Sequence, residues 1–395
     1  MAGFTETFRS VPAWIGNDFV LDAAAKYTVD CHQAFMRQDE TALNSAKKSG
    51  AEAMRALRFA LAQSSIDATD PMLMSMYAMI MSEASLPFVQ QDGDATDENY
   101  NYKLHELALC QILKQRWTSG RWGILEQRLL RSIHSEEALE SAITGTVSDL
   151  DDPLRISAAR AISSTDTHTN QLFDSIMDQT IRLPRLSALH RQLRLEGPED
   201  PDLVTQITSL AKTLWAFTQA PQIESVIDSH SSTSPSPDDT TCPLQALDFT
   251  SIRIYILATR HHMNRIILAL NLLKLLALHP FPFPYSEIRT TLLHSAEFIS
   301  RCIPYAIHSS SSSSGPPWNA LRIFAPLTLA YGAWVFLEGE EEGDDHVRAM
   351  REFTAWGFRK MAESWRWNAG LGLLLGYTEA WTGGETMEWM AKKRG

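Results

Sequence analysis

The residues of this chain whose types could do chemistry are first of all its histidines. His261–His262 is the only adjacent pair, and His105 and His134 lie in helical patterns with Glu106 and Glu137 nearby. Neighbouring positions on a helix point about 100° apart, so the pair cannot bind one metal in the usual i, i+4 manner. The spacing His-Glu-x-x-His is not present. We therefore expect structural histidines, no metal site and no cofactor.

Cysteine usage gives no support for a zinc cluster or a redox dithiol. The sequence has four cysteines, Cys31, Cys110, Cys242 and Cys302, and none of them forms a Cys-x-x-Cys pair. Each lies far from the others in sequence, and their surroundings are apolar patterns. We expect buried, reduced thiols of an intracellular protein.

Other motifs of catalysis are missing from the sequence. Gly370, Gly372 and Gly376 lie in NAGLGLLLGYTE, but no strand pattern precedes them as a nucleotide-binding loop requires. Close backbone packing at a helix turn is the favoured interpretation. The sequence also has no Gly-x-Ser-x-Gly elbow. We predict no catalytic residue.

An aromatic stripe near the C-terminus is the candidate ligand or partner surface. Its rings could line an apolar pocket, although a plain core role is favoured. The intervening arginines could bind an anion or extend past the ring edges into water. The stripe and its arginines are Trp356, Phe358, Arg359, Trp365, Arg366, Trp367 and Trp381.

Positioning these residues falls to helices, because apolar residues recur at three- and four-residue spacing along most of the chain. We predict helices over Val20–Phe35, with Asn17 or Asp18 as cap, and over Leu43–Leu61, whose small residues indicate close helix contact. A third helix, Met72–Ser85, starts at Asp70-Pro71. Its methionines, Met72, Met74, Met76, Met79 and Met81, indicate adaptable packing against a partner helix or a ligand.

The later part of the chain shows the same pattern with clear punctuation. We predict a helix over Asn170–Gln179 that Pro184 prevents from continuing, and another from Pro201 through Thr218. The segment Phe281–Tyr285, FPFPY, indicates an extended connection docked on the core. No alternating strand pattern persists, so the predicted fold is all-α: one large domain of packed antiparallel helices over 1–395.

Two low-complexity tracts interrupt the helices. Residues 228–241 (DSHSSTSPSPDDTT) and 309–317 (SSSSSSGPP) are predicted to be disordered insertions, because their composition cannot bury enough apolar surface to offset ordering entropy. Both lie between apolar helices, so we expect surface insertions into one domain.

The net charge of the chain argues against direct binding of nucleic acid by this protein alone. The net charge is −12 among 395 residues, and the longest basic cluster is only Lys392-Lys393-Arg394. The most apolar stretch, Ile266–Leu278, is too short to span a membrane and is typical of a core helix. We see no secretory signal at the N-terminus.

The order of motifs resembles the regulatory domain of fungal zinc-binuclear-cluster transcription factors. The segments that carry the resemblance are PAWIGNDFVLDAAAKY, YKLHELALCQILKQR, AEFISRCIPYAI, WNALRIFAPLTLAYGAW and FTAWGFRKMAESWRWNAGLGLLLGY. The resemblance implies an all-helical regulatory domain acting in transcription in the nucleus, and also in the cytoplasm, on a biosynthetic or catabolic gene set. It implies partners in the transcription machinery or a DNA-binding regulator, and a small-molecule effector.

The chain departs from this family in one respect. The family's DNA reader is a six-cysteine cluster that binds two zinc ions, and no such cluster is present. Two explanations stay open. The chain is a regulator that lacks the zinc cluster and acts through partners, or an upstream exon encodes the cluster. The alternative function is a helical enzyme or small-molecule-binding protein recruited from the same scaffold, and a third is an interaction module without a transcriptional role.

Overall fold

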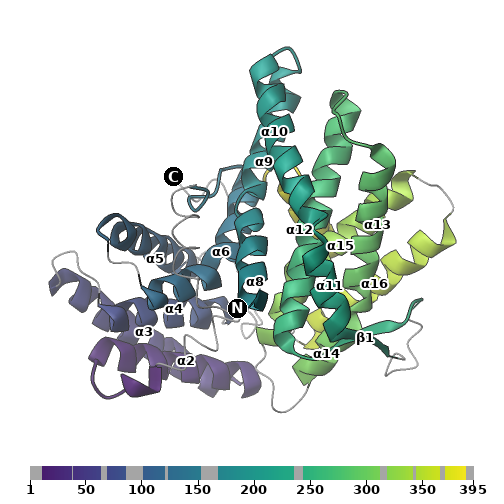
Figure 1. Cartoon of the computed structure of the whole chain (residues 1–395). Helices are drawn as coiled ribbons and strands as arrows, with labels where there is room; N and C mark the ends of the chain where they lie inside the picture. The colour runs from purple at the N-terminus through teal and green to yellow at the C-terminus, as the bar shows by residue number, and fades with distance from the viewer. Residues whose placement is uncertain are drawn as a thin grey trace. The chain divides into compact units, whose positions relative to one another are not determined.

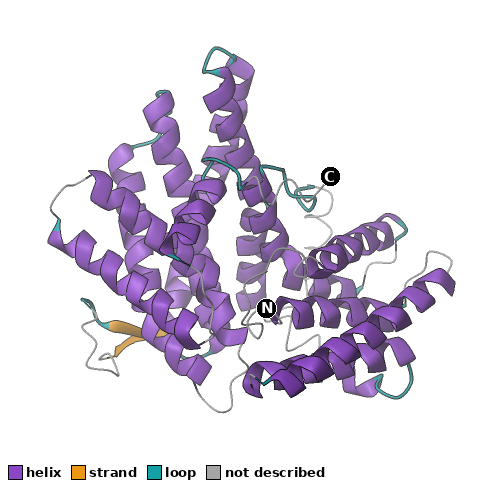
Figure 2. Cartoon of the chain, turned by 180° about the vertical axis from the view of Figure 1, so that it is seen from behind, coloured by secondary structure: helices purple, strands orange, loops and turns teal. Residues whose placement is uncertain are grey.

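The computed structural model is built almost entirely of helices (Figures 1 and 2), which confirms the predicted all-α class. Within the described residues, the only sheet pairs β1 (Ser231–Ser234) with β2 (Ala246–Phe249) in antiparallel register. The chain forms two compact units, and the boundary between Ile133 and His134 falls within one helix. The structure describes residues 11–37, 39–63, 69–85, 101–120, 123–152, 168–234, 243–311, 318–340, 344–364 and 370–387.

The first unit is a set of amphipathic helices around a buried one. Its elements are η1 (Val11–Ala13), α2 (Phe19–Arg37), α3 (Glu40–Gln63), α4 (Asp70–Ser85), α5 (Asn101–Thr118) and the start of α6 (Ile124–Thr144). Helices α2, α3 and α4 contain the three predicted helical segments.

Capping residues set the helix starts in the first unit. The Asp18 carboxylate accepts bonds from the backbone N–H groups of Val20 and Leu21, both at 2.9 Å, so the predicted cap is present. Helix α4 begins at Asp70, one position before the proline predicted to open it. Thr69 takes the capping role there, because its Oγ1 accepts from Met72 N at 3.4 Å.

Helix α4 is the centre of this unit. Met72, Met74, Met76 and Met79 are all buried, with α2, α3 and α5 packed around them. The predicted methionine cluster is therefore core that packs against partner helices of the same unit. Close helix contact is also confirmed in α3, where a Cβ on Gly50 would overlap the Tyr27 ring of α2.

The second unit surrounds one long helix. Its helices are the end of α6, α8 (His168–Thr180), α9 (Leu183–Glu196), α10 (Pro201–Thr218), α11 (Pro221–His230), α12 (Ile252–Leu278), α13 (Tyr285–Arg301), α14 (Ile303–Ser311), α15 (Trp318–Glu340), α16 (Asp345–Ser364) and α17 (Leu371–Trp381). Helices α8 and α10 confirm the predicted segments, and the α8–α9 turn precedes Pro184 as expected.

Helix α12 lies in the middle of the second unit (Figure 1), and almost every residue from Ile254 to Leu275 is buried. Helices α8–α11, α13 and α15 pack against it. The predicted core helix Ile266–Leu278 is part of it. Among the described residues, no helix is long and apolar enough to cross a membrane. Phe281 and Phe283 of the following connection are buried, as expected for aromatic residues that dock on the core.

Two side chains join the beginning of the second unit to its end. Arg191 of α9 donates to the carbonyls of Ala142, Ala380 and Gly384, with the bond to Gly384 O at 2.9 Å. The Trp381 indole N–H donates to Leu139 O at 2.9 Å. Helix α17 is thereby fixed beside the end of α6.

Three predictions need correction. Residues 228–234 are ordered: α11 extends to His230 and Ser231–Ser234 forms β1, because β2 supplies backbone partners that composition does not reveal. Ser309–Ser311 continue α14. The remaining parts of both tracts lie outside the described residues.

The close backbone packing predicted at Gly370, Gly372 and Gly376 is also wrong. A Cβ added to Gly370 or Gly372 would meet no described atom within 4 Å, and one added to Gly376 would make only ordinary contact with the Met387 side chain at 3.6 Å. Gly370 has φ −80° and precedes α17.

Candidate functional site

A cluster of ionisable side chains lies within the second unit, where α11, α12 and α13 meet. Glu224 comes from α11, His261, His262 and Arg265 from α12, and His294 from α13. Four of the five are the residue types that bind metals or move protons near neutral pH. Their presence in a helical core calls for a physical account.

Local sequence explains why the three helices bring these residues together. Pro221 opens α11 after a short turn, and the Ser251 hydroxyl caps α12 by accepting from Ile254 N at 3.3 Å. The rigid Phe281–Phe283 connection then returns the chain antiparallel as α13. The packing of α13 against α12 places His294 and Ser295 opposite His262.

Glu224 lies near three other members of the cluster. Its Oε1 pairs with Arg265 Nη1 and lies 3.4 Å from His261 Nε2. Its Oε2 lies 3.9 Å from His262 Nε2, beyond hydrogen-bond distance. One carboxylate oxygen is therefore engaged by the guanidinium, while the other faces a histidine without bonding it.

His262 is fully buried, with 0% of its surface exposed. Its ring stacks on Phe298 with centroids 3.8 Å apart, and its Nδ1 lies 3.3 Å from Ser295 Oγ. Its Nε2 has no hydrogen-bond partner. The ring is thus held in one orientation and presents an unsatisfied nitrogen toward Glu224 and His294.

Burial controls the protonation of the cluster. It lowers the pKa of His262 well below the usual value, and neighbouring His261 and Arg265 lower it further. Burial also lowers the pKa of His261, and partial burial of the ring together with nearby Arg265 lowers the pKa of His294, although Glu224 opposes both shifts. For Glu224 burial raises the pKa, but His261 and Arg265 outweigh it and the net shift is downward. At neutral pH the histidines are neutral and Glu224 is ionised.

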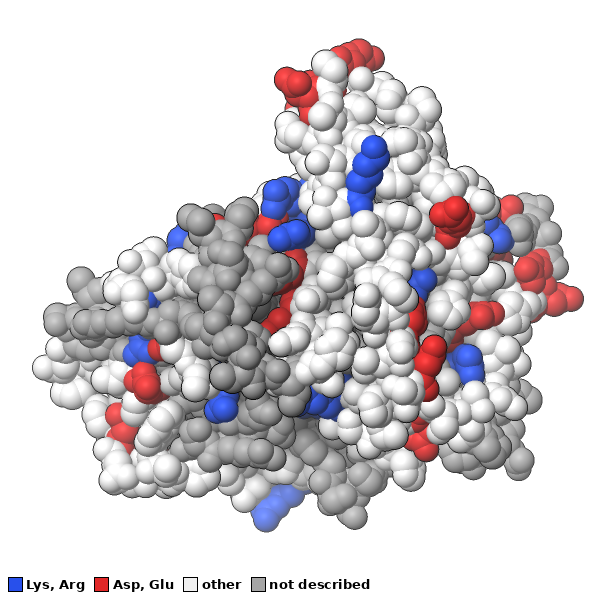
Figure 3. Space-filling view, viewed as in Figure 1, with Lys and Arg blue, Asp and Glu red and all other residues white. Residues whose placement is uncertain are grey.

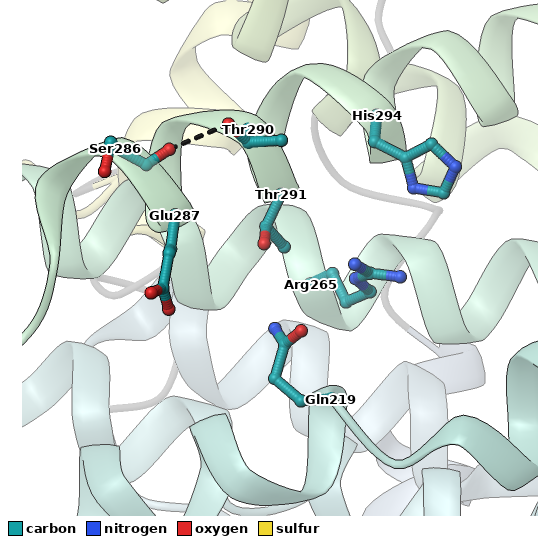
Figure 4. A pocket seen from close by; sticks show the side chains of 7 residues that line it. All are labelled: Gln219, Arg265, Ser286, Glu287, Thr290, Thr291 and His294. Carbon is teal, nitrogen blue, oxygen red and sulfur yellow. Dashed lines mark hydrogen bonds between the residues drawn. The ribbon is translucent and has the colours of Figure 1, made fainter.

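A pocket of about 470 Å³ opens next to the cluster (Figure 4). Arg265 and His294 lie at one end and Glu287 at the other, with polar side chains between them. Its lining consists of Gln219, Arg265, Ser286, Glu287, Thr290, Thr291 and His294. This volume lies in the range of small-molecule sites.

No family model, curated protein or solved structure matches the chain.

The cluster contains the order Ser295–His262–Glu224, which is the residue order of a hydrolytic triad. Two observations argue against nucleophilic catalysis. Ser295 has 0% of its surface exposed, so no substrate reaches its Oγ. The 3.9 Å gap between His262 Nε2 and Glu224 Oε2 is also too long for the orienting hydrogen bond. The arrangement is suited to binding a cation or a small polar ligand.

The candidate surface predicted from sequence is placed elsewhere. Trp356 is half-buried and stacks on Phe353 with centroids 5.4 Å apart, while Arg359 is exposed. Neither residue lines the pocket beside the cluster, nor a second pocket of about 530 Å³ whose lining includes Leu189 of α9 and Thr213 of α10. Trp365, Arg366 and Trp367 lie outside the described residues, so a structural role for Trp365 and Trp367 stays a prediction. Phe358 and Trp381 are buried core, as favoured.

The other singled-out residues have structural settings. His105 is buried, with Nε2 3.3 Å from Glu83 Oε1, while the side chain of His134 lies outside the described part. Three cysteines, Cys31, Cys110 and Cys302, are buried as predicted, and Cys242 lies outside the described residues.

Sequence reasoning missed Glu224, Arg265 and His294 altogether. It tested His261–His262 only against ligand spacings within one helix, whereas the structure assembles its cluster from three. The signal that was present is the FPFPY connection, which folds α12 back on α13 and brings positions 262 and 294 together.

Proposed function

We propose that the protein is a transcription-regulator-like helical protein that binds a small carboxylic acid in the pocket between α12 and α13. In this proposal it acts in the nucleus, through a DNA-binding partner, on a biosynthetic or catabolic gene set. The resemblance of its motifs to fungal regulatory domains and its all-helical fold support the regulatory part. The pocket supports the effector part.

The position of Arg265 is the main support for the binding of a small carboxylic acid. Its guanidinium lines the pocket, yet it is buried and its Nε has no hydrogen-bond partner. Glu224 engages one of its terminal nitrogens. A carboxylate entering the pocket satisfies the remaining donors through charge-assisted bonds. Glu287 at the opposite end favours a ligand that also carries a hydroxyl or amino group.

Exposed apolar side chains support action through a protein partner. In the first unit, Phe19 is 57% and Phe59 is 59% exposed, and their rings pack edge to face at 6.2 Å. Val29 and Met36 of α2 are also exposed. Exposed aromatic and aliphatic residues of this kind occur at interaction surfaces.

Effector binding is tested on metal-stripped protein with succinate, malate and aspartate, against uncharged succinamide. A ligand at one hundred times its Kd stabilises the fold by about 2.7 kcal/mol, which raises Tm by several degrees. Thr290→Trp fills this pocket and should remove the shift. Thr213→Trp is the matched control: it enters the other cavity, and both threonines bond a carbonyl four residues back. No shift with any acid, or equal loss in both variants, refutes the effector.

Regulation is tested separately. The full chain, fused to a heterologous DNA-binding domain, should change transcription from a reporter in fungal cells, whereas the domain alone should not. Thr290→Trp should reduce the response. A fusion that is present in the nucleus and leaves reporter output unchanged contradicts the regulatory role without bearing on acid binding.

The unfused chain should bind duplex DNA only weakly and without sequence preference. Its net charge is −12, and on the face drawn in Figure 3 Lys and Arg are scattered among Asp and Glu. Nanomolar, sequence-specific binding at physiological salt, measured without a partner, is the result that overturns this expectation.

One observation favours a helical enzyme as the second candidate. The neutral histidines beside the pocket have the protonation state of general bases. Substrate turnover that survives Ser295→Ala and is lost in His294→Ala is the pattern expected of that function.

A further inference from the structure

We propose that Glu224, His262 and His294 bind one divalent transition-metal ion, with Zn²⁺ the best fit to two imidazoles and a carboxylate. The site is argued from these side chains alone and does not rest on the regulatory role proposed above. Two histidines and one glutamate are a recurrent ligand set of zinc sites that keep an open position.

The three side chains lie close enough to bind one ion. One ligand atom from each of the three residues lies within 4.8 Å of the other two. Zinc–ligand bonds of about 2.0–2.2 Å place tetrahedral ligands roughly 3.3–3.5 Å apart, so the site has to contract modestly around the ion. His294 is exposed and projects from α13, so its side chain is free to make this adjustment.

His262 has a ring nitrogen without a hydrogen-bond partner. When Nδ1–H donates to Ser295 Oγ at 3.3 Å, Nε2 carries a lone pair and faces Oε2 of Glu224 at 3.9 Å. A lone pair and a carboxylate repel each other in a buried site, and a cation between them turns the repulsion into two bonds. An outer hydrogen bond on one ring nitrogen with the metal on the other is the usual arrangement of ligating histidines.

Arg265 and His261 are the neighbours of Glu224 that affect the binding of a cation. Arg265 opposes a cation, but it engages Oε1 of Glu224 and leaves Oε2 for the metal. His261 faces Oε1 as well, at 3.4 Å. The guanidinium therefore weakens binding without blocking it.

The three ligands leave an open coordination position. His294 lines the pocket, so one side of the metal site borders it. Water or a carboxylate from the pocket is the ligand expected at that position. The bound metal would then give the pocket a second group that recognises an oxygen donor.

The test is a zinc titration of the full, metal-stripped chain in competition with a chromophoric chelator at pH 7.5, without any carboxylic acid. We expect one zinc per chain, and affinity that falls about tenfold or more in both Glu224→Gln and His294→Ala. His308→Ala, which removes another exposed histidine, should bind as the wild type does. Cobalt(II) should give the visible absorption of a low-coordinate nitrogen–oxygen site in the wild type and in His308→Ala, and should not give it in Glu224→Gln or His294→Ala.

His294 is exposed, so His294→Ala keeps the test valid if Glu224→Gln fails to fold. Equal zinc affinity in His294→Ala and His308→Ala, or a stoichiometry far below one, overturns the proposal. Zinc binding without acid binding, or the reverse, separates this site from the effector pocket.

Discussion

His190 and His262 are two buried histidines of the same unit, and comparing them shows what distinguishes a structural histidine from a ligand. Each has one ring nitrogen near a side-chain oxygen, Asn271 Oδ1 at 3.1 Å for His190 and Ser295 Oγ at 3.3 Å for His262. Each also has an Nε2 without a hydrogen-bond partner. An unsatisfied nitrogen alone therefore does not identify a binding site.

The difference lies in the charges around each ring. Lys274, Arg191 and Arg194 surround His190 and, after burial, lower its pKa to about 4. A cation near His190 would meet three positive charges. His262 faces the ionised Glu224 and a second neutral imidazole, and its cluster adjoins a pocket. The electrostatic surroundings, more than burial, mark His262 as the ligand candidate.

The largest expected effect in this comparison is the change of folding stability with pH that His190 causes. His190 has a pKa of about 4 in the folded chain and 6.5 in the unfolded chain. Between these two pH values the unfolded chain therefore binds a proton that the folded chain does not bind. The free energy of unfolding is unaffected above pH 6.5 and falls as pH drops toward 4, by about 3 kcal/mol from this residue. Denaturant titrations from pH 7.5 to 4.5 measure it. His190→Gln should flatten the slope, and an unchanged slope means that other groups produce it.

Removing the partner of His190 should have the next largest effect. Asn271→Leu leaves His190 Nδ1 unpaired and removes a 2.9 Å bond to Ile267 O, which costs about 2–3 kcal/mol of stability. Asn264→Leu is the control, since Asn264 bonds Ile176 O and Thr180 away from both histidines. NMR titration should show a pKa shift for His190 only in Asn271→Leu. A shift in both variants means that the two regions are coupled.

Ser295→Ala is the corresponding change at His262, and its structural cost should be smaller. The loss of one buried hydrogen bond costs about 1 kcal/mol. Zinc affinity should fall about tenfold, because the serine orients the ligating ring. Chemical denaturation and the zinc competition measure the two quantities. Undiminished zinc affinity would show that Ser295 only fills space.

The smallest expected effect on stability belongs to His294→Ala without metal. The residue is exposed at the pocket, so the free energy of unfolding should stay within about 0.5 kcal/mol of the wild type. A loss above about 2 kcal/mol would make His294 a structural residue like His190, and the contrast between the two clusters would fail.

Sequence patterns predicted the helices well and the site poorly, for one physical reason. Spacing along the chain reports which face of a helix is apolar, and this located α2, α3 and α4 and the buried stretch of α12. Spacing does not report which polar residues of other helices lie against a given helix face. Glu224 and His294 lie in unremarkable amphipathic helices, and only the packing of α11 and α13 on α12 gives them a role. β1 and β2 were missed likewise, because each strand depends on a partner distant in sequence.

The Arg191 and Trp381 bonds have a consequence for synthesis of the protein in the cell. They join α9 and α17 to the carbonyls at the end of α6, across as many as 242 positions of sequence between Trp381 and Leu139. The second unit therefore cannot close its core until α17 has left the ribosome. Nascent chains that end before Leu371 should expose the inner faces of α6 and α9, remain sensitive to protease and depend on chaperones.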